Sequence, residues 1–289
     1  MIDRQLLIDV YQQACEIELQ AFKPGNVSIY SAAHDMTVDD FRLSAQVSAA
    51  AITNPDYNLS EKIYFSVKAT REAVGCNTNL GIILLCAPLM QAMQQCNVIT
   101  ELRSSLENVL CNTTLQDADW VFKAIVLASP GGLGGADQQD VNEVPTVTLL
   151  QAMEIASDKD RIALQYTNSF KDIFDFAVME YNRAFVLSGE SGWAALSVFA
   201  EMLSRFPDSH IERKYGKQYS EWIAGEMALL CKAMKAANKL EEVLPMLYSI
   251  DKTFKARKIN PGTTADMTVA TVLVALLERQ VSHELTNTF

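Results

Sequence analysis

The sequence predicts an all-α protein in which roughly ten to twelve helices pack around one buried central helix. Two observations carry this prediction. Nearly every long segment of the 289 residues repeats its apolar side chains at helical spacing, and alternating runs of β-branched residues are almost absent. Only Phe122–Leu127 has a composition that would also suit a strand. Because no repeat and no Ser-, Pro- or Gly-rich linker divides the chain, we expect residues 1–289 to form a single domain.

The helices expected in the first half have recognisable ends. Asp3 precedes an apolar stripe that extends to Ala21, so it is a candidate N-cap. Thr37–Asp40 and Thr114–Asp117 resemble capping boxes, with Asp in place of the usual Glu, and each predicts a helix start. Gly75 follows another apolar stripe and is expected to end that helix.

The segment Leu80–Met93 is apolar on all sides, which predicts the buried central helix. Pro88 lies inside it and is expected to kink it, because proline cannot donate the helical hydrogen bond. Stripes at helical period predict the other elements at Leu102–Leu110, Leu149–Ala156, Ile162–Ala177, Trp193–Phe206, Tyr219–Ala236, Leu240–Phe254 and Thr264–Glu278.

The charge balance limits the classes of partner. A net charge of −11 argues against nucleic-acid binding, since a phosphate backbone is bound by an excess of Lys and Arg. Three separated histidines and six cysteines without a C-x-x-C pair argue against a zinc site. Most of the cysteines fall on apolar helix faces, as in a reduced cytoplasmic protein. The N-terminus does not have the form of a signal peptide, and the longest apolar run is too short to span a membrane.

The segment Asn260–Asp266 is the most informative part of the chain. It combines a Pro-Gly turn at Gly262, two hydroxyls at Thr263 and Thr264, and a carboxylate in the first turn of an apolar helix. A helix start offers N–H groups and a positive dipole end to an anion. Asp266 could hold a divalent cation against phosphates. The alternative is that one threonine merely caps the helix.

Three further polar segments lie at helix boundaries. The first runs from Lys23 through Asn26 to His34 and Asp35, and it carries a cation, an amide, an imidazole and a carboxylate. A purely structural Asx-type loop would also explain it. The second, Gly75–Gly81, precedes the central helix. Its three hydrogen-bonding side chains exceed what a cap needs, so we expect them to orient a base, a ribose or phosphate oxygens; they are Asn77, Thr78 and Asn79.

The third segment, Pro130–Gly135, has four glycines in six residues. Such backbone can approach a ligand closely and present N–H groups to an anion. It is neither a Walker motif nor a Rossmann loop, and a surface loop is the alternative. We expect Gly131, Gly132 and Gly134 to bind phosphate, and Asp137 and Asp140 to be magnesium ligands together with Asp266.

Basic residues are few in this acidic chain, so local clusters are informative. Arg213 and Lys214 form one such cluster, and we expect them, with Lys23, to offset the charge of a polyphosphate. A solvated helix end is the alternative for any single lysine.

These segments, in this order, resemble the triphosphoribosyl-dephospho-coenzyme A synthase family over almost the whole chain, from Lys23 to about Leu277. The resemblance implies an all-helical fold and an unusual glycosyl transfer. In that reaction ATP loses adenine from its ribose C1, and the triphosphoribosyl group passes to the 2′-hydroxyl of dephospho-coenzyme A. The matching motifs are Lys23-Pro-Gly, His34-Asp35-Met36, Asn77-Thr78 with Gly81, Gly131–Gly135, Asn260-Pro-Gly and Ala265-Asp266.

This reaction needs a general base for the acceptor hydroxyl and negative charge near an oxocarbenium-like centre. We expect Asp35, with His34 beside it, to supply the catalytic chemistry. The expected substrates are ATP with Mg²⁺ and dephospho-CoA or a related acceptor. The many apolar helices also permit a homodimer.

The chain departs from well-characterised members at Asn79-Leu80, where they carry a His-Lys pair. In this respect it is closer to a divergent branch of archaea and methylotrophic bacteria. Alternative hypotheses therefore stay open. One is an ATP-dependent enzyme of one-carbon-carrier cofactor biosynthesis, with a different acceptor or product. Another is a non-catalytic nucleotide-binding homologue.

Overall fold

The computed structural model describes residues 2–31, 36–96, 98–129, 139–237 and 239–286, with side chains up to residue 280. Within these ranges every regular element is helical, and an isolated bridge pairs Ser28 with Ser31. The prediction of an all-α fold is confirmed. The segment Phe122–Leu127, which also suited a strand, lies inside a helix.

The described part of the chain contains fourteen α-helices. Those of the first half are α1 (Arg4–Gln20), α2 (Val38–Ile52), α3 (Leu59–Val74), α4 (Leu80–Gln95), α5 (Leu102–Cys111), α6 (Leu115–Ala128) and α7 (Leu149–Ala156). Those of the second half are α8 (Arg161–Thr167), α9 (Val178–Ser188), α10 (Ser191–Arg205), α11 (Ser209–Tyr215), α12 (Ser220–Ala236), α13 (Leu244–Ala256) and α14 (Gly262–Thr286).

The predicted helix ends are confirmed because their signals are local. The Asp3 side chain accepts a hydrogen bond from the backbone N–H of Gln5 at the start of α1. Complete capping boxes start α2 at Thr37 and α6 at Thr114. Gly75 ends α3 in the left-handed conformation, with φ of 79°.

The prediction of one long helix over Ile162–Ala177 is wrong. It is broken after Thr167, where Ser169 and Phe170 take positive φ values of 54° and 57°. One π-helical turn, Ile173–Ala177, then leads into α9. The apolar spacing in the sequence does not reveal this break. Phe170 is fully buried in the structure, and it would also lie on the buried face of an unbroken helix. This split and the short helix α11 account for the extra helices.

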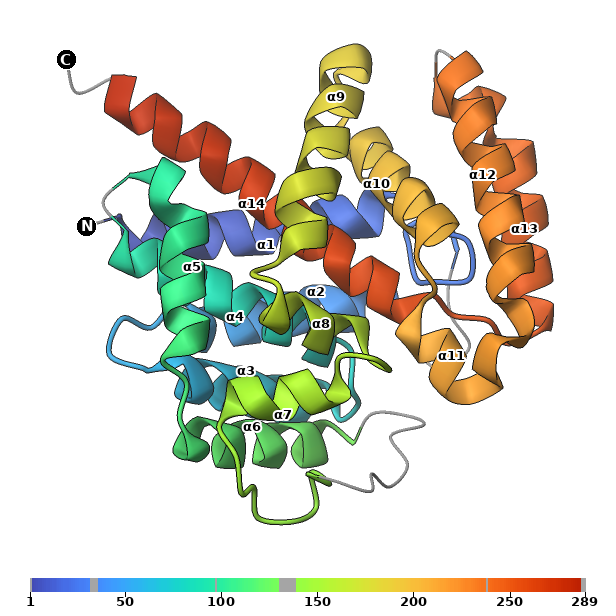
Figure 1. Ribbon diagram of the computed structural model, residues 1–289. Coiled ribbons are helices and arrows are strands. Elements are labelled where there is room, and N and C mark those ends of the chain that lie inside the picture. The colour runs from blue at the N-terminus through green and yellow to red at the C-terminus, as the bar shows by residue number, and fades with distance from the viewer. Residues whose placement is uncertain (1, 32–35, 97, 130–138, 238, 287–289) are drawn as a thin grey trace.

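Two helices, not one, form the centre of the fold. The expected helix α4 is buried along almost its whole length, and so is α14 from Thr263 to Leu277. Helix α14 crosses the molecule and packs against α1, α4, α9 and α10 (Figure 1). Its first turn lies beside α11, at the opposite end from the chain's C-terminus (Figure 1).

Pro88 in α4 leaves the carbonyl of Leu84, four residues earlier, without its helical donor. The buried Tyr166 hydroxyl donates to that carbonyl oxygen at 2.6 Å. An interaction between α4 and α8 therefore replaces the missing hydrogen bond within α4.

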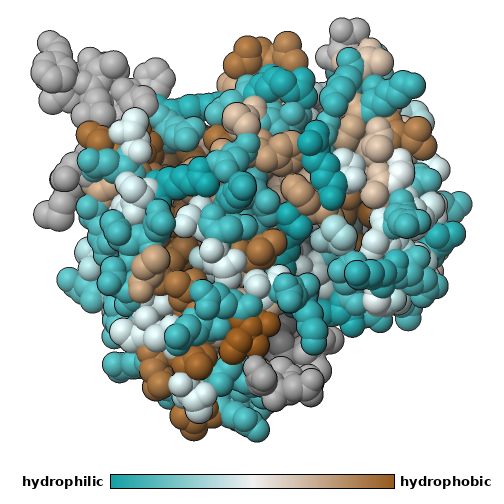
Figure 2. All heavy atoms as spheres, viewed as in Figure 1, coloured by the Kyte–Doolittle hydropathy of each residue, from teal (hydrophilic) through white to brown (hydrophobic). Residues whose placement is uncertain are grey.

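Polar side chains cover most of the face drawn in Figure 2, and apolar groups gather at the outer end of α9 and over α6 and α7. On α9, Val186 and Leu187 are 81% and 75% exposed. In the described residues, no helix is long and apolar enough to cross a membrane.

Candidate functional site

The first and last of the predicted polar segments meet in the structure. The Asn26 amide nitrogen donates to the Asn260 side-chain oxygen at 2.7 Å. One residue earlier, the Gly25 N–H donates to the Asp251 carboxylate at 2.8 Å. Gly25 has φ of 80°, and a Cβ there would lie 2.6 Å from the carbonyl oxygen of Ile259. The close approach of these two loops therefore requires glycine.

The last segment also meets the segment before the central helix. Gly81, in the first turn of α4, packs directly against the side chain of Asp266 in the first turn of α14. A Cβ on Gly81 would overlap the Asp266 carboxylate and lie 2.6 Å from its Cγ. Three stretches that are far apart in the sequence thus meet along the segment from Asn260 to Asp266.

The surroundings of Asp266 disfavour the negative charge of its carboxylate. Burial raises its pKa well above the usual range, and the nearby charges of Glu18, Asp208 and Asp160 raise it further, while Arg213 lowers it. Within the described ranges, no hydrogen bond or ion pair holds its oxygens. A carboxylate in such a setting is poised to accept a cation or a proton.

The start of α14 is closed by a protein carboxylate, in place of the phosphate that we expected there. One oxygen of Asp208 accepts from both the N–H and the hydroxyl of Thr264, each at 2.8 Å. The Thr263 hydroxyl accepts from the backbone N–H of His210 at 3.2 Å, and the Gly262 N–H donates to the Asn260 carbonyl at 2.9 Å. The helix terminus does attract an anion, but that anion belongs to the chain itself.

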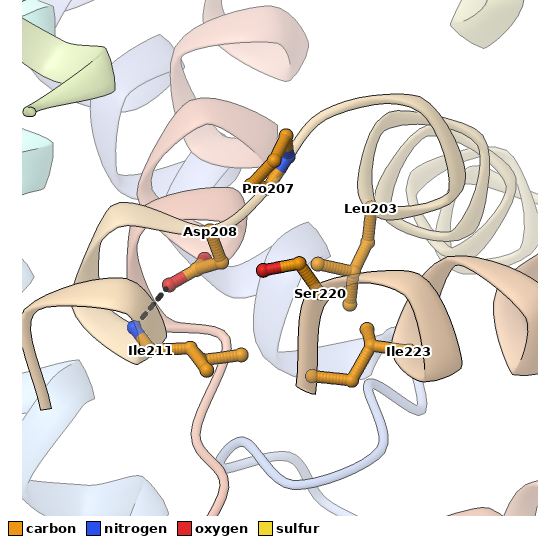
Figure 3. Close-up of a pocket in the computed structure, with 6 residues that line it drawn as sticks. All are labelled: Leu203, Pro207, Asp208, Ile211, Ser220 and Ile223. Carbon is orange, nitrogen blue, oxygen red and sulfur yellow. Dashed lines mark hydrogen bonds between the residues drawn. The ribbon is translucent and has the colours of Figure 1, made fainter. Parts of the chain in front are cut away.

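Asp208 has a second function as the N-cap of α11, where its other oxygen accepts from the backbone N–H of Ile211 (Figure 3). Figure 3 shows it at the edge of a small hollow that Leu203, Pro207 and Ile223 line with apolar atoms. Both Asp208 oxygens are already engaged by the protein. We therefore assign Asp208 to the support of the site.

A second pocket lies between α1, α2 and the start of α4. It is small, with a cavity volume of about 10 Å³ that would hold about one water molecule, and it is partly open to solvent. Two polar side chains line it, Glu18 and Asn79, and both residues are at most 4% exposed. The other lining residues are Cys15, Leu19, Phe41, Ala45 and Ile82.

Lys23 was expected to offset the charge of a polyphosphate, but its side chain points into the protein interior. Its side chain is fully buried, and its ammonium donates to the carbonyls of Glu18 and Val27 at 2.8 Å and contacts a Glu18 carboxylate oxygen at 3.1 Å. Burial lowers the pKa of Lys23 and raises that of Glu18, and each charge opposes the shift of the other. Since its donors already have protein partners, Lys23 has none left for a phosphate.

Of the polar residues before α4, Asn77 and Thr78 support the helix start, and Asn79 lines the pocket. The Asn77 side-chain oxygen accepts from the backbone N–H of Leu80 at 3.1 Å, and the Thr78 hydroxyl bonds the Ser44 hydroxyl at 2.5 Å. Both contacts fix the start of α4. The amide of Asn79 makes one long contact, 3.5 Å, to the Ser48 hydroxyl, so it is the member of this segment with capacity for a ligand.

Arg213 and Lys214, the predicted basic pair, have different surroundings. Arg213 forms an ion pair of 2.6 Å with Asp160 and lies close enough to Asp266 to lower its pKa. Lys214 is exposed and lies 5.2 Å from the ring of its neighbour Tyr215. His210 lies against the start of α14, and its pKa is lowered by burial and by both cations. Arg213 thus acts on Asp266 directly, whereas Lys214 acts on His210 and its side chain is exposed.

Several predicted residues lie outside the described residues. These are His34, Asp35, Gly131, Gly132, Gly134 and Asp137. Asp140 is described, and its carboxylate accepts from the backbone and side-chain nitrogens of Asn142 in a local turn.

The described side chains do not form a preformed metal cage. Within the ranges that the structure covers, no three His, Cys, Asp or Glu side chains come together as metal ligands. Among the described residues of this site, Asp266 offers two carboxylate oxygens that no hydrogen bond or ion pair occupies. This fits the way in which proteins hold Mg²⁺ on a nucleotide, with one or two carboxylates and the phosphates as the remaining ligands.

Sequence reasoning missed Glu18, Asp160 and Asp208. Asp160 and Asp208 each stand before a short helix as N-caps, a signal that indicates local structure and says nothing of a site. The sequence did contain an indication that Glu18 is functional. It lies on the buried face of α1, four residues after Ala14, where a charged residue needs an explanation.

Comparisons with known proteins support the family resemblance. The profile of the family described as ATP:dephospho-CoA triphosphoribosyl transferase matches residues 4–284. A crystal structure of a candidate triphosphoribosyl-dephospho-CoA synthase from Archaeoglobus fulgidus has a TM-score of 0.61 and 24% identity, over 81% of this chain and 97% of that chain. That likeness shows a shared fold. The comparison with curated proteins finds no match. From the family match, the chain belongs to the ATP:dephospho-CoA triphosphoribosyl transferase family and is a transferase.

Proposed function

We propose that this enzyme transfers the triphosphoribosyl group of ATP to a hydroxyl of dephospho-CoA or a related cofactor precursor and releases adenine. The observation that supports this most directly is the position of Asp266. Its carboxylate has no protein partner among the described residues, and it lies in the segment that contacts the other two polar segments.

In this proposal Asp266 holds Mg²⁺ on the triphosphate, with Asp137 and Asp140 as the further predicted ligands. Mg²⁺ would neutralise phosphate charge at a site that is itself acidic. Arg213 would contact phosphate oxygens while Asp160 fixes its position. Asn79 would orient the ribose or the adenine from the pocket wall, and Asn77 and Thr78 would hold Asn79 in place.

The acceptor hydroxyl must lose a proton as the new glycosidic bond forms. His34 and Asp35 keep their predicted part in this acid–base chemistry. The phosphate-binding backbone of Gly131, Gly132 and Gly134 likewise stays a prediction. So do the cytoplasmic location, the single domain of residues 1–289 and the absence of a nucleic-acid partner. All six cysteines are free thiols, which supports the reducing compartment.

A changed acceptor is the second candidate, and one observation favours it. Asn79 lines the pocket at the point where well-characterised relatives carry the first residue of a His-Lys pair. A neutral amide and Leu80 in place of two basic groups would suit a less anionic acceptor. This alternative includes a precursor of a one-carbon-carrier cofactor.

The test is incubation with ATP, Mg²⁺ and dephospho-CoA, with free adenine measured by chromatography. Adenine release that depends on dephospho-CoA supports the proposal. Release with other hydroxyl acceptors supports the changed substrate. Tight ATP binding without adenine release would refute both and favour a non-catalytic nucleotide-binding protein, and ADP or AMP as product would indicate a kinase or ligase.

A further inference from the structure

We propose that Glu18 is a catalytic carboxylate whose charge faces the ribose and stabilises the positive charge that develops at C1 as adenine departs. Lys23 is then a positioning residue that keeps Glu18 ionised and oriented. This inference rests on the proposed triphosphoribosyl transfer and assigns a residue to its central step.

The location of Glu18 is the first observation. It projects from the last turn of α1 into the pocket that Asn79 also lines, and the residue is only 4% exposed. Its charge is felt by Asp266, whose pKa it raises. Asn79 lines the pocket, and Gly81, two residues further along, packs against Asp266. The pocket and the expected metal ligand are therefore close neighbours, as the two ends of one ribose triphosphate require.

The pairing with Lys23 is the second observation. A buried carboxylate without a cation becomes neutral, and a neutral acid would not stabilise positive charge. Lys23 contacts one Glu18 oxygen at 3.1 Å and is itself held by the carbonyls of Glu18 and Val27. Ala21 provides a further carbonyl at 3.4 Å. A lysine so held is a fixed charge, because it has no freedom to follow a ligand.

The chemistry balances with this assignment. The bond between C1 and the adenine nitrogen breaks, and its electron pair leaves with adenine. The acceptor oxygen forms the new bond to C1, and the proton lost from its hydroxyl equals the proton that adenine gains. Between these events C1 carries partial positive charge, and a carboxylate fixed beside it favours that state over the neutral ground state.

Glu18→Gln tests the proposal, and Glu16→Gln is the matched control. Glu16 lies on the same helix and pairs with Arg42 at the surface. We expect Glu18→Gln to lower kcat for adenine release on the order of 100-fold, with KM for ATP changed less than about threefold. Glu16→Gln should keep both constants. Glu18→Asp, which keeps the charge but withdraws it from the pocket, should fall between them.

A binding measurement separates this role from a structural one. An iminoribitol triphosphate, whose ring nitrogen is cationic at neutral pH, mimics the charge at C1, and ribose triphosphate is its neutral counterpart. Wild type should bind the cationic ligand more tightly, and Glu18→Gln should lose that preference while it keeps the affinity for ribose triphosphate. A preference that survives in Glu18→Gln, or an unchanged kcat, would overturn the role of Glu18. Failure of wild type to release adenine would instead refute the proposed function.

Discussion

Replacement of Gly81 by Ala tests the contact on which the site depends. In the first turn of α4, the new Cβ would overlap the Asp266 carboxylate and lie 2.6 Å from its Cγ and 2.8 Å from Ile162 Cδ1. Since a short, partly buried side chain has little room to yield, we expect the carboxylate to rotate away from the site. Nucleotide binding and adenine release should therefore fall sharply.

The stability effect follows from two opposing terms. Ala in place of Gly favours a helix by about 1 kcal/mol, and overpacking costs about 1–3 kcal/mol. Gly225→Ala is the matched control, because Gly225 is exposed within α12 and a Cβ there meets nothing within 4 Å. That variant should gain up to about 1 kcal/mol, or about 2 °C in thermal midpoint. The difference between the two variants then isolates the overlap.

A double-mutant cycle shows whether Asp266 is the group displaced. In an Asp266→Ala background the carboxylate and its Cγ are absent, and the contact with Ile162 remains. The cost of Gly81→Ala should shrink by about 1 kcal/mol there, measured by urea unfolding. If Gly81→Ala costs the same in both backgrounds, or binds ATP with Mg²⁺ as wild type does, the packing described for α4 and α14 is refuted.

Three further substitutions probe the residues around this contact. Asp208→Ala removes the caps of α11 and α14 together and should cost about 2 kcal/mol or more, against about 1 kcal/mol for the single cap lost in Asp3→Ala; equal losses in urea unfolding would refute the double role. Gly25→Ala should destabilise more than Gly189→Ala, because both have positive φ but only Gly25 faces a carbonyl 2.6 Å away; equal thermal midpoints would contradict that loop contact. Asp266→Asn should not lower the thermal midpoint at pH 7. The folded pKa of Asp266 is raised, so its contribution to stability is present below its unfolded pKa and is lost as pH rises through the folded pKa. The Asn variant should lack that loss, and a collapsed midpoint with intact ligand affinity would make Asp266 a residue of the fold.

The sequence was sufficient for most helices because their determinants are local. Asp3, Thr37 and Thr114 cap their helices through contacts two or three residues away, and each was predictable. The break at Ser169 was not, because the flanking apolar residues keep the helical period across it. Periodicity reports which face is buried and does not report whether the backbone continues.

The site was harder to predict because its contacts join distant residues. The sequence marked Asn26, Asn260 and Asp266 correctly as polar residues at helix boundaries, and the structure brings their segments together. It could not show that Asp208, 56 residues before Thr264, fills the helix start that was expected to bind phosphate. Nor could it show Lys23 turned inward, since that depends on Glu18 facing the same interior.

The charges around Asp266 lead to one last prediction, about metal dependence. Asp266, Glu18, Asp160 and Asp208 place four carboxylates near one another, against the two cations Lys23 and Arg213. An anionic triphosphate would be repelled from this site unless a cation came with it. We therefore expect wild type to bind ATP far more weakly when EDTA removes Mg²⁺.

Asp266→Asn removes one of these carboxylates and gives the sharper comparison. Without metal, and at a pH above the folded pKa of Asp266, it should bind ATP more tightly than wild type does, because the repulsion is smaller. With Mg²⁺ it should bind more weakly, because a metal ligand is lost. Isothermal titration calorimetry of both proteins, with and without Mg²⁺, measures all four affinities. If the order of the two proteins is the same in both conditions, Asp266 does not act through a metal, and its unpartnered carboxylate needs a different explanation.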